Sequence, residues 1–261
     1  MSYETLLYEK EDGIAIVTMN RPDRLNALSF KLKEDLSNVF DAMEKDDEVK
    51  VVILTGGPKA FCAGADIKER SGIQMGQSQS FFERRKSHAF FCKIEDFEKT
   101  VIAAVSGVAV GGGCELSLVC DLRIASETAR FGVPEVKIGA IPAAGGTQRL
   151  PRIIGITKAK ELLYTGDFVD AQEAYRLNLV NKVVPVDKLM DTAKELARKI
   201  MNNPPLSVKF SKRAVNGGMQ MDLASALEFE AFCSTIVVFS EDRIEGFKAF
   251  VEKRKPIYKG R

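Results

Sequence analysis

The chain has 261 residues, of which 45% are hydrophobic and 28% are charged, and its formal net charge is +2 at pH 7. A chain of this length and composition buries a large core, either as one extended domain or as a domain with a helical appendage. The nearly balanced charge gives no general signature of polyanion binding, and no stretch approaches the roughly 20 apolar residues of a membrane span.

Short β-rich runs alternate with helical segments in the first part of the chain. Residues 1–10 contain acidic side chains and no long apolar run, which disfavours a targeting leader and predicts a cytoplasmic protein. Residues 30–44 carry apolar side chains at helical spacing, with Ser29 as the N-cap. This alternation predicts a parallel α/β arrangement, with strands at residues 14–19, 51–54, 101–105 (continuing near Val108), 122–125 and 179–184.

Residues 71–91 form the most polar stretch before the glycine-rich segments. Glycine, serine and glutamine concentrate in residues 71–80, which predicts a mobile loop that enters a helix, or else an ordinary surface connection. His88, the only histidine, stands in a charged run, where a solvated helical position is expected rather than a ligand or a base. A catalytic triad built on histidine is therefore not expected.

After residue 202 the pattern becomes wholly helical. The Pro204-Pro205 pair ends the preceding helix near Met201. Residues 231–239 are too apolar for a solvated helix, so we expect them to be buried against the core or against another subunit. The sequence predicts an α/β core over residues 1–201 and a helical oligomerisation region over residues 202–261, with helices at 206–215, 222–238 and 240–253.

The segment Gly111-Gly-Gly-Cys-Glu115 joins an apolar strand to a helix. Glycines let a substrate oxygen approach the main chain, and the free N–H groups of a helix start favour negative charge. Glu115 would stand beside such a site, as acid/base chemistry on a carbonyl compound requires. The simpler alternatives are a carboxylate that stabilises the helix dipole and glycines that allow close packing.

Two further segments supply related features. Glu135 follows Pro134 and precedes a glycine-rich turn, so a second carboxylate is available, although a solvated loop position is the alternative. Residues 60–67 follow the apolar run 51–54 and are placed to present a second backbone N–H to the same oxygen. Two carboxylates near one oxyanion site would divide the proton transfers between them.

Competing motifs fail on inspection. A dinucleotide fingerprint starting at Gly111 needs a sixth-position glycine, which here is Leu116, and no Gly-Lys-Ser/Thr tripeptide of a P-loop occurs. No Cys-x-x-Cys pair exists, so buried free thiols in a reducing compartment are predicted rather than zinc ligands, at Cys62, Cys92, Cys114, Cys120 and Cys233.

Taken together, the three segments resemble the crotonase superfamily, and a glutamate in both the Gly111–Glu115 and the Pro134-Glu135 motifs resembles enoyl-CoA hydratases in particular. The resemblance extends from residues 20–28 through 163–167 to 250–255 and thus covers nearly the whole chain. It implies a spiral of ββα repeats followed by C-terminal helices that build trimers, paired into hexamers.

The resemblance also implies roles for individual residues. The N–H groups of Ala65 and Gly112 would form an oxyanion hole for a thioester carbonyl, while Glu115 and Glu135 would flank a water molecule. One glutamate would act as base on the water, and Glu135 would exchange the proton at the α carbon. The N–H of Ala143 would help to orient the water. The family usually has glycine there, and dienoyl-CoA isomerases have aspartate.

Coenzyme A contacts follow from the same resemblance. The adenine would lie against the backbone of residues 63–67, and Lys253 would meet phosphates, with a neighbouring subunit as one source of this residue. The alternative for Lys253 is a cation that complements the dipole of the last helix. The complete set of expected contacts is Arg24, Ala63, Asp66, Ile67, Lys68, Phe232 and Lys253. No metal or redox cofactor is implied, since coenzyme A is part of the substrate.

The sequence thus predicts a cytoplasmic enoyl-CoA hydratase that adds water reversibly to a short- or medium-chain trans-2-enoyl-CoA and forms a 3-hydroxyacyl-CoA. The first alternative is a 3-enoyl-CoA isomerase, which needs chiefly one carboxylate. The second is a noncatalytic or RNA-binding member of the superfamily that uses the basic run Arg84-Arg-Lys86. Neither nucleic acid nor membrane is the expected partner; a homo-oligomer is.

Overall fold

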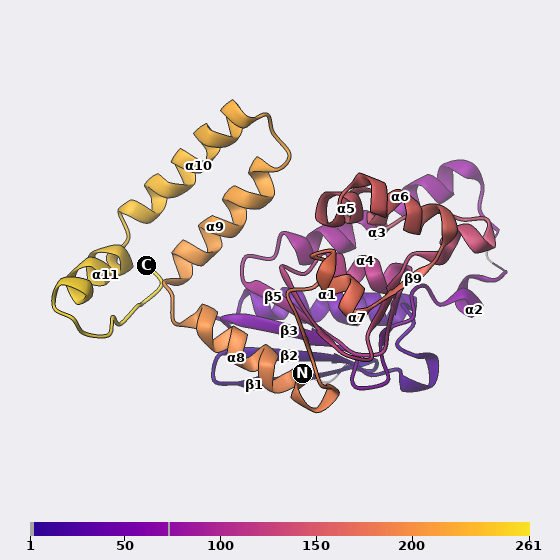
Figure 1. Ribbon diagram of the computed structural model, residues 1–261, viewed down its shortest axis with the longest axis horizontal. Coiled ribbons are helices and arrows are strands. Elements are labelled where there is room, and N and C mark those ends of the chain that lie inside the picture. Colours follow the sequence, from indigo (N-terminus) through magenta and orange to yellow (C-terminus); the bar gives the residue numbers. More distant parts are fainter. Residues whose placement is uncertain (1–2, 73) are drawn as a thin grey trace.

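The computed structural model describes residues 3–72 and 74–261, and its strands form two sheets (Figure 1). The larger sheet has six strands, in the order β1 (Leu6–Glu11), β2 (Ile14–Met19), β3 (Val51–Thr55), β5 (Thr100–Val105), β7 (Leu122–Ser126) and β10 (Lys182–Val184). The smaller sheet has four strands, in the order β4 (Ala60–Cys62), β6 (Val108–Val110), β8 (Arg130–Gly132) and β9 (Phe168–Asp170). Only the β1–β2 and β8–β9 pairs are antiparallel.

The chain alternates between the two sheets in a repeating turn. One strand enters the larger sheet, the next enters the smaller sheet, and a helical segment returns the chain. Three successive turns follow this pattern: β3 and β4 with α2 (Ile67–Arg70) and α3 (Gln77–Glu95), β5 and β6 with α4 (Gly112–Leu118), and β7 and β8 with η2 (Pro134–Ile138) and α5 (Gly146–Ile154). The predicted spiral of ββα repeats is therefore confirmed.

Side-chain alternation on the larger sheet creates two apolar layers. Ile14 and Ile16 of β2 face the helix α8 (Leu189–Met201), whereas Ala15 and Val17 face the main core. Successive residues of a strand point to opposite faces, so a sheet covered on both sides reads as a continuous apolar run. This double burial explains why residues 14–19 and 51–54 carry such a strong strand signal.

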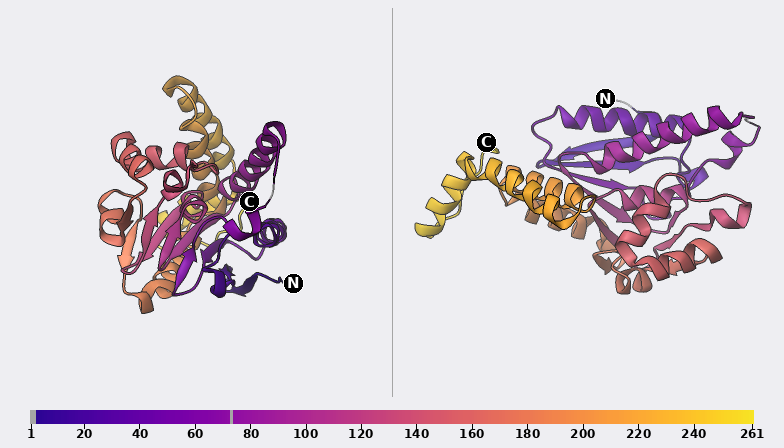
Figure 2. Two further views of the ribbon diagram at one scale, coloured as in Figure 1. Left: turned by 90° about the vertical axis from the view of Figure 1, so that its right-hand side faces the viewer. Right: turned by 90° about the horizontal axis from the view of Figure 1, so that it is seen from above.

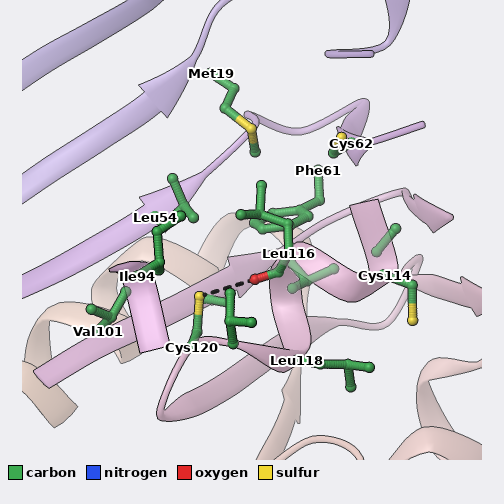
Figure 3. Packing of buried hydrophobic residues seen from close by; sticks show 14 of the residues in the cluster. Met19, Leu54, Phe61, Cys62, Ile94, Val101, Cys114, Leu116, Leu118 and Cys120 are labelled. Carbon is green, nitrogen blue, oxygen red and sulfur yellow. Dashed lines mark hydrogen bonds between the residues drawn. The ribbon is translucent and has the colours of Figure 1, made fainter. Parts of the chain in front are cut away.

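The main core fills the space between the two sheets and the helices α1 (Phe30–Glu44) and α4. Leu54 and Val101 of the larger sheet pack there with Phe61 of β4, Ile94 of α3 and Leu116 of α4 (Figure 3). All five side chains are buried. Because strands of both sheets and α4 share this core, the position of α4 is fixed relative to the ends of the smaller sheet.

Most predicted elements are found close to their expected bounds. Helix α1 spans the predicted 30–44, and the Ser29 hydroxyl accepts the Leu32 N–H at 3.0 Å. The prediction of a strand over 179–184 is wrong for its first half. The N–H groups of Leu179 and Val180 donate to the carbonyl of Ala174 at 2.8 and 3.3 Å, because they form the exit turn of α7 (Ala171–Arg176).

Four strands were not predicted. Strand β1 forms a hairpin with β2 through Asp12 and Gly13, whose φ values are 48° and 81°. An Asp-Gly pair with positive φ at both positions is a strong hairpin signal, so this strand was accessible from the sequence. Strands β4, β8 and β9 have three residues each, too few to show alternation.

The last three helices leave the core. Helices α9 (Pro205–Gly218) and α10 (Leu223–Val238) form a hairpin that projects from the sheets, and α11 (Glu241–Val251) lies beyond it (Figures 1 and 2). The prediction that residues 231–239 are buried against the core is wrong within one chain. Cys233 is the only buried residue of α10, while Phe232 and Phe239 are 62% and 81% exposed. Burial against another subunit stays a prediction.

No single helix of the described ranges is both long and apolar enough to cross a membrane. Helices α10 and α11 pass this test only as a pair, and their axes bend by 72° where they join. Of the remaining segments, α6 (Ile156–Thr165) packs against α5, while η1 (Pro22–Arg24) and η3 (Val186–Lys188) are short turns.

Candidate active site

The carboxyl ends of β4, β6 and β8 converge at one edge of the smaller sheet. The three strands are parallel neighbours, with Cys62 paired to Ala109 and Ala109 paired to Phe131. Chain segments that follow such strands emerge together, as ligand-binding segments do in parallel sheets. This topology gathers residues 63–66, 111–115 and 133–135, which are the three segments singled out from the sequence.

Two backbone donors meet at this edge. Gly112 opens α4, so its N–H is one of the first-turn groups without an acceptor inside the helix. Ala65 forms a bridge with Leu28 in which Leu28 N donates to Gly64 O and Asp66 N donates to Leu28 O. These two bonds leave the N–H of Ala65 outside the pairing. A Cβ added to Gly112 would lie 3.7 Å from the Ala65 nitrogen.

The glycines of the Gly111–Glu115 motif are required by close contacts. Gly111 has φ of 54°, and a Cβ there would lie 2.9 Å from a carboxyl oxygen of Glu135. A Cβ on Gly113 would lie 2.0 Å from the carbonyl oxygen of Cys62, which no real contact permits. The glycines therefore allow the close packing of strand and helix that was expected as an alternative. The backbone donors are present as well, so the two roles do not exclude each other.

Glu115 lies in the first turn of α4 and is only 3% exposed. Its Oε1 accepts the N–H of Ala144 at 2.8 Å and the N–H of Gly146 at 2.7 Å. Burial raises the pKa of Glu115, and these two backbone donors act against that increase. A carboxyl that only complemented the helix dipole would be solvated, so the burial contradicts that simpler alternative.

Glu135 lies in η2 and faces the same space from the next strand end. Its Oε1 is the atom that a Cβ added to Gly111 would meet first. Its Oε2 is buried and has no hydrogen-bond partner in residues 3–72 and 74–261. Burial raises the pKa of Glu135 and the charge of Glu115 raises it further. A buried carboxyl oxygen without a partner is costly, so this atom is available for a substrate or a water molecule.

The arrangement has the parts of an acid/base site on a carbonyl compound. Two carboxyls with raised pKa values, Glu115 and Glu135, stand near two backbone donors from Ala65 and Gly112. The charge of Glu115 raises the pKa of Glu135, so the two carboxyls are electrostatically coupled. Such a pair is equipped to take a proton from one atom and to give a proton to another.

The loop 140–146 holds Glu115 through groups that sequence reasoning missed. The donors to its carboxylate are the N–H groups of Ala144 and Gly146. The carbonyl of Ala143 faces His88 at 2.9 Å, and a water-orienting role for the Ala143 N–H stays a prediction. Gly146 is the first residue of α5, so the glycine-rich turn before a helix was the available signal for these donors.

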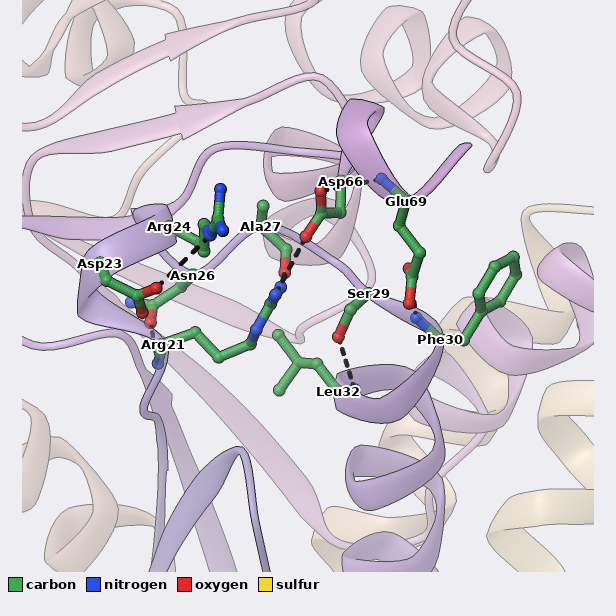
Figure 4. A network of polar contacts seen from close by, with 10 residues as sticks. All are labelled: Arg21, Asp23, Arg24, Asn26, Ala27, Ser29, Phe30, Leu32, Asp66 and Glu69. Carbon is green, nitrogen blue, oxygen red and sulfur yellow. Dashed lines mark hydrogen bonds and ion pairs between the residues drawn. The ribbon is translucent and has the colours of Figure 1, made fainter. Parts of the chain in front are cut away.

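Several residues expected to contact coenzyme A lie in or next to α2, and Figure 4 shows two of the expected residues, Arg24 and Asp66. The Asp66 carboxylate accepts the Glu69 N–H as the N-cap of α2 and pairs with Arg21 at 3.0 Å. Its side chain therefore has a structural role, and its N–H and carbonyl are bonded to Leu28 and Arg70. The expected contacts of Asp66 and Ala63 with coenzyme A stay predictions. Ile67 and Lys68 are exposed in α2, and Arg24 is exposed beside Asp23 at 3.4 Å.

Phe232 and Lys253 do not join this group within one chain. They belong to α10 and to the turn after α11, which lie at the opposite end of the molecule from α2 (Figure 1 and the right view of Figure 2). Phe232 and Lys253 are both exposed. A coenzyme A site that includes them therefore needs a second copy of the chain.

The cysteines are free and mostly buried, as predicted. Cys62, Cys114, Cys120 and Cys233 are buried and Cys92 is half-buried. Burial raises the pKa of Cys62, Cys114 and Cys120 to about 12 in each case, so these thiols are protonated at neutral pH. Within the described residues, no three His, Cys, Asp or Glu side chains are grouped to hold a metal ion.

A large hollow lies beside this site. It has a volume of about 2070 Å³ and is lined by α3, residues 139–145, α5 and α9; we call it the α3–α9 hollow. Neither Glu115 nor Glu135 lines it, although the loop 139–145 forms part of its wall. The candidate acid/base site is therefore defined by its carboxyls and backbone donors, which lie on the inner side of that loop, and not by the hollow.

Comparison with known proteins gives consistent results. Residues 9–261 match the model of the enoyl-CoA hydratase/isomerase family. The chain is 47% identical to a short-chain-enoyl-CoA hydratase of Clostridium acetobutylicum, over 98% of this chain and 97% of that protein. It is 43% identical to a crotonyl-CoA hydratase of Syntrophomonas wolfei, over 98% of each. The crystal structure of an enoyl-CoA hydratase from Bacillus anthracis superposes with a TM-score of 0.94 at 44% identity, covering 99% of this chain and 100% of that one.

Proposed function

Because this chain belongs to the enoyl-CoA hydratase/isomerase family, we propose that it adds water reversibly to the double bond of a trans-2-enoyl-CoA and forms a 3-hydroxyacyl-CoA. The observation that carries this proposal is the pair Glu115 and Glu135, two carboxyls with raised pKa values beside the backbone donors of Ala65 and Gly112. Water addition needs two proton transfers, one from the water that attacks the β carbon and one to the α carbon. This pair supplies a group for each.

The thioester carbonyl is the group that the backbone donors would bind. Its oxygen accepts the N–H groups of Ala65 and Gly112 and gains negative charge when the β carbon is attacked. Donors fixed before the reaction need no reorganisation at that moment, and each contributes about 10²- to 10³-fold in rate. Their placement by a strand end and a helix start makes them part of the rigid scaffold.

The two glutamates then divide the proton transfers. The ionised carboxyl takes a proton from water as the water oxygen bonds to the β carbon, and the protonated one gives its proton to the α carbon. Glu115, held at Oε1 by two N–H groups, keeps Oε2 free for the water. Glu135, with an unpartnered buried oxygen, serves the α carbon. Exchange with solvent resets both carboxyls, and general acid/base catalysis of this kind contributes about 10²- to 10⁴-fold.

We propose a short acyl chain as the preferred substrate, within the short- to medium-chain range expected from the sequence. Support comes from the relatives, whose names specify short-chain enoyl-CoA and crotonyl-CoA. A panel of trans-2-enoyl-CoA thioesters of increasing chain length tests this. The highest kcat/KM is expected at the short end, and a maximum at long chains would contradict the assignment.

We propose further that the active species is a trimer or a hexamer of this chain. The reason is that Phe232 and Lys253 lie far from α2 in one chain, while α10 leaves Phe232 and Phe239 exposed. An apolar surface of this kind marks an interface. In this proposal residues 202–261 form the oligomerisation region and residues 1–201 the core, the protein works in the cytoplasm, and no metal or redox cofactor takes part.

The two alternatives predict different outcomes. A 3-enoyl-CoA isomerase depends chiefly on one carboxyl, and the buried, doubly hydrogen-bonded Glu115 favours the hydratase. An RNA-binding role would use the run Arg84-Arg-Lys86, but Lys86 is engaged by Glu83 at 2.7 Å. Binding of the protein to immobilised RNA at modest salt would support that role, and absence of binding would dispose of it.

A further inference from the structure

One peptide group connects the single histidine to a candidate catalytic carboxyl. His88 Nε2 lies 2.9 Å from the carbonyl oxygen of Ala143. The same peptide group carries the N–H of Ala144, which donates to Glu115 Oε1 at 2.8 Å. A continuous path of two hydrogen bonds therefore runs from helix α3, through the peptide between residues 143 and 144, to the buried carboxyl of α4.

We propose that His88 is a positioning residue for Glu115, and that it acts by fixing and polarising the peptide group between Ala143 and Ala144. The proposal rests on the hydratase function proposed above. It adds a role to the solvated helical position that the sequence predicted for His88. The side chain is on the exposed face of α3, as expected, but it has a specific partner there.

The hydrogen-bond chemistry gives the direction of the effect. A neutral imidazole with its proton on Nε2 donates to the Ala143 carbonyl, and the imidazolium donates more strongly because it is charged. Donation to a carbonyl oxygen polarises the whole peptide, so the Ala144 N–H becomes a better donor to Glu115. A better donor favours the ionised carboxylate. The positive charge of His88 likewise lowers the pKa of Glu115, against the larger effect of burial.

A second contact, from α5, fixes the next peptide of the loop. Arg149 Nη1 donates to the carbonyl of Ala144 at 3.0 Å. The same guanidinium pairs with Glu95 of α3, at 2.8 Å through Nε and 2.5 Å through Nη2. Two successive carbonyls of the loop are thus held, one by His88 of α3 and one by Arg149 of α5, which is itself paired with α3, while two N–H groups of the loop hold Glu115. The orientation of α3 is thereby coupled to the orientation of the carboxyl.

Charged groups on three helices line the hollow beside His88. Arg84 of α3 and Arg152 of α5 line the same hollow, and Arg149 is paired with Glu95. Across the hollow, the cations of α9 are paired with Glu98 and Asp121.

Two substitutions of His88 separate the effect of its N–H donor from the effect of its positive charge. His88→Leu removes the donor and is expected to lower kcat by about 3- to 10-fold, the factor for one neutral hydrogen bond, with a small change in KM. His88→Gln keeps a donor that does not titrate. It is expected to restore most of kcat, but to move the acidic limb of the pH profile of kcat/KM to higher pH, because the positive charge that favours the Glu115 carboxylate is gone.

Arg85→Gln is the matched control, since it removes an exposed cation from the same helix. It is expected to leave kcat, KM and the pH profile at wild-type values. Wild-type kcat and pH profile in His88→Leu would overturn the proposal. So would an equal loss in Arg85→Gln, because the effect would then reflect the general charge of α3.

Nuclear magnetic resonance tests the coupling without turnover. The chain has one histidine, so its imidazole signals need no assignment by mutation. The substitution Glu115→Gln is expected to shift these imidazole signals, since coupling between two sites is reciprocal. Unchanged imidazole signals would overturn the proposal. If the wild-type protein lacked hydratase activity, the proposed function would fail while this measurement still reported on the contact.

Discussion

Replacement of Glu115 by glutamine separates the chemistry of this residue from its structural contacts. The carboxylate accepts two backbone N–H groups through one oxygen, at 2.8 Å from Ala144 and 2.7 Å from Gly146. The glutamine amide oxygen is able to accept both, so the loop 140–146 keeps its hydrogen bonds. The amide takes no proton from water. We therefore expect kcat to fall by at least about 10²-fold, the lower end for a general acid/base group, while substrate binding changes far less.

Although this substitution lowers kcat, it is expected to stabilise the folded state relative to wild type, by an amount that depends on pH. Burial raises the pKa of Glu115, so the folded state holds this proton more tightly than the unfolded chain does. The corresponding stabilisation is complete below the ordinary glutamate pKa and is lost as the pH rises through the folded pKa. Glutamine does not titrate and escapes that loss. The melting temperature of Glu115→Gln minus that of the wild type is therefore expected to be higher at pH 8 than at pH 4.

Hydration kinetics and thermal melts at both pH values measure these two effects. Glu115→Ala is the matched comparison, because it leaves the N–H groups of Ala144 and Gly146 without an acceptor, at about 1–3 kcal/mol for each unpaired group. Asp121→Asn is a control at another largely buried carboxyl whose pKa burial raises, outside the site. It is expected to retain kcat. Near-normal turnover in Glu115→Gln would remove Glu115 from the mechanism, and an equal stability difference at both pH values would refute the burial argument.

Three further results are expected. Glu135→Gln should lower hydration by at least about 10²-fold and slow the exchange of the α proton with deuterated solvent; wild-type exchange would exclude Glu135 as the group at the α carbon. Gly113→Ala should cost about 1–3 kcal/mol or more in urea unfolding, because the added methyl meets the Cys62 carbonyl, whereas Gly218→Ala, whose Cβ would lie 3.5 Å from that of Ala226, should cost little. Light scattering should give a trimeric or hexameric mass, and truncation after Asn202 should abolish both assembly and activity; a monomeric mass for the active, intact chain would contradict completion of the coenzyme A site by a neighbour.

Local patterns predicted the elements that are covered on both faces or capped by a clear residue. The strand 14–19 and the helix 30–44 were predicted with their observed bounds. The strands β4, β8 and β9 were not predicted, because three-residue strands gain their stability from sheet neighbours and carry no periodic signal.

The candidate site was likewise predicted only in part. The side chains of Glu115 and Glu135 were found because glycine and proline mark the turns next to them. The loop contacts were missed, since the bonds from Ala144 and Gly146 to Glu115 span 29 and 31 residues and exist only after α5 packs near α4. The exposed helical position of His88 was predicted, but its hydrogen-bond partner was missed, because that partner lies 55 residues away.

The most direct test of the central claim is the fate of a trans-2-enoyl-CoA and of its 3-enoyl isomer with one preparation of the protein, in water labelled with heavy oxygen and in deuterated water. A hydratase of the proposed mechanism yields 3-hydroxyacyl-CoA with a solvent oxygen on the β carbon and a solvent hydrogen on the α carbon. This reaction should be faster than conversion of the 3-enoyl thioester. Migration of the double bond without incorporation of solvent oxygen would contradict the account and identify an isomerase.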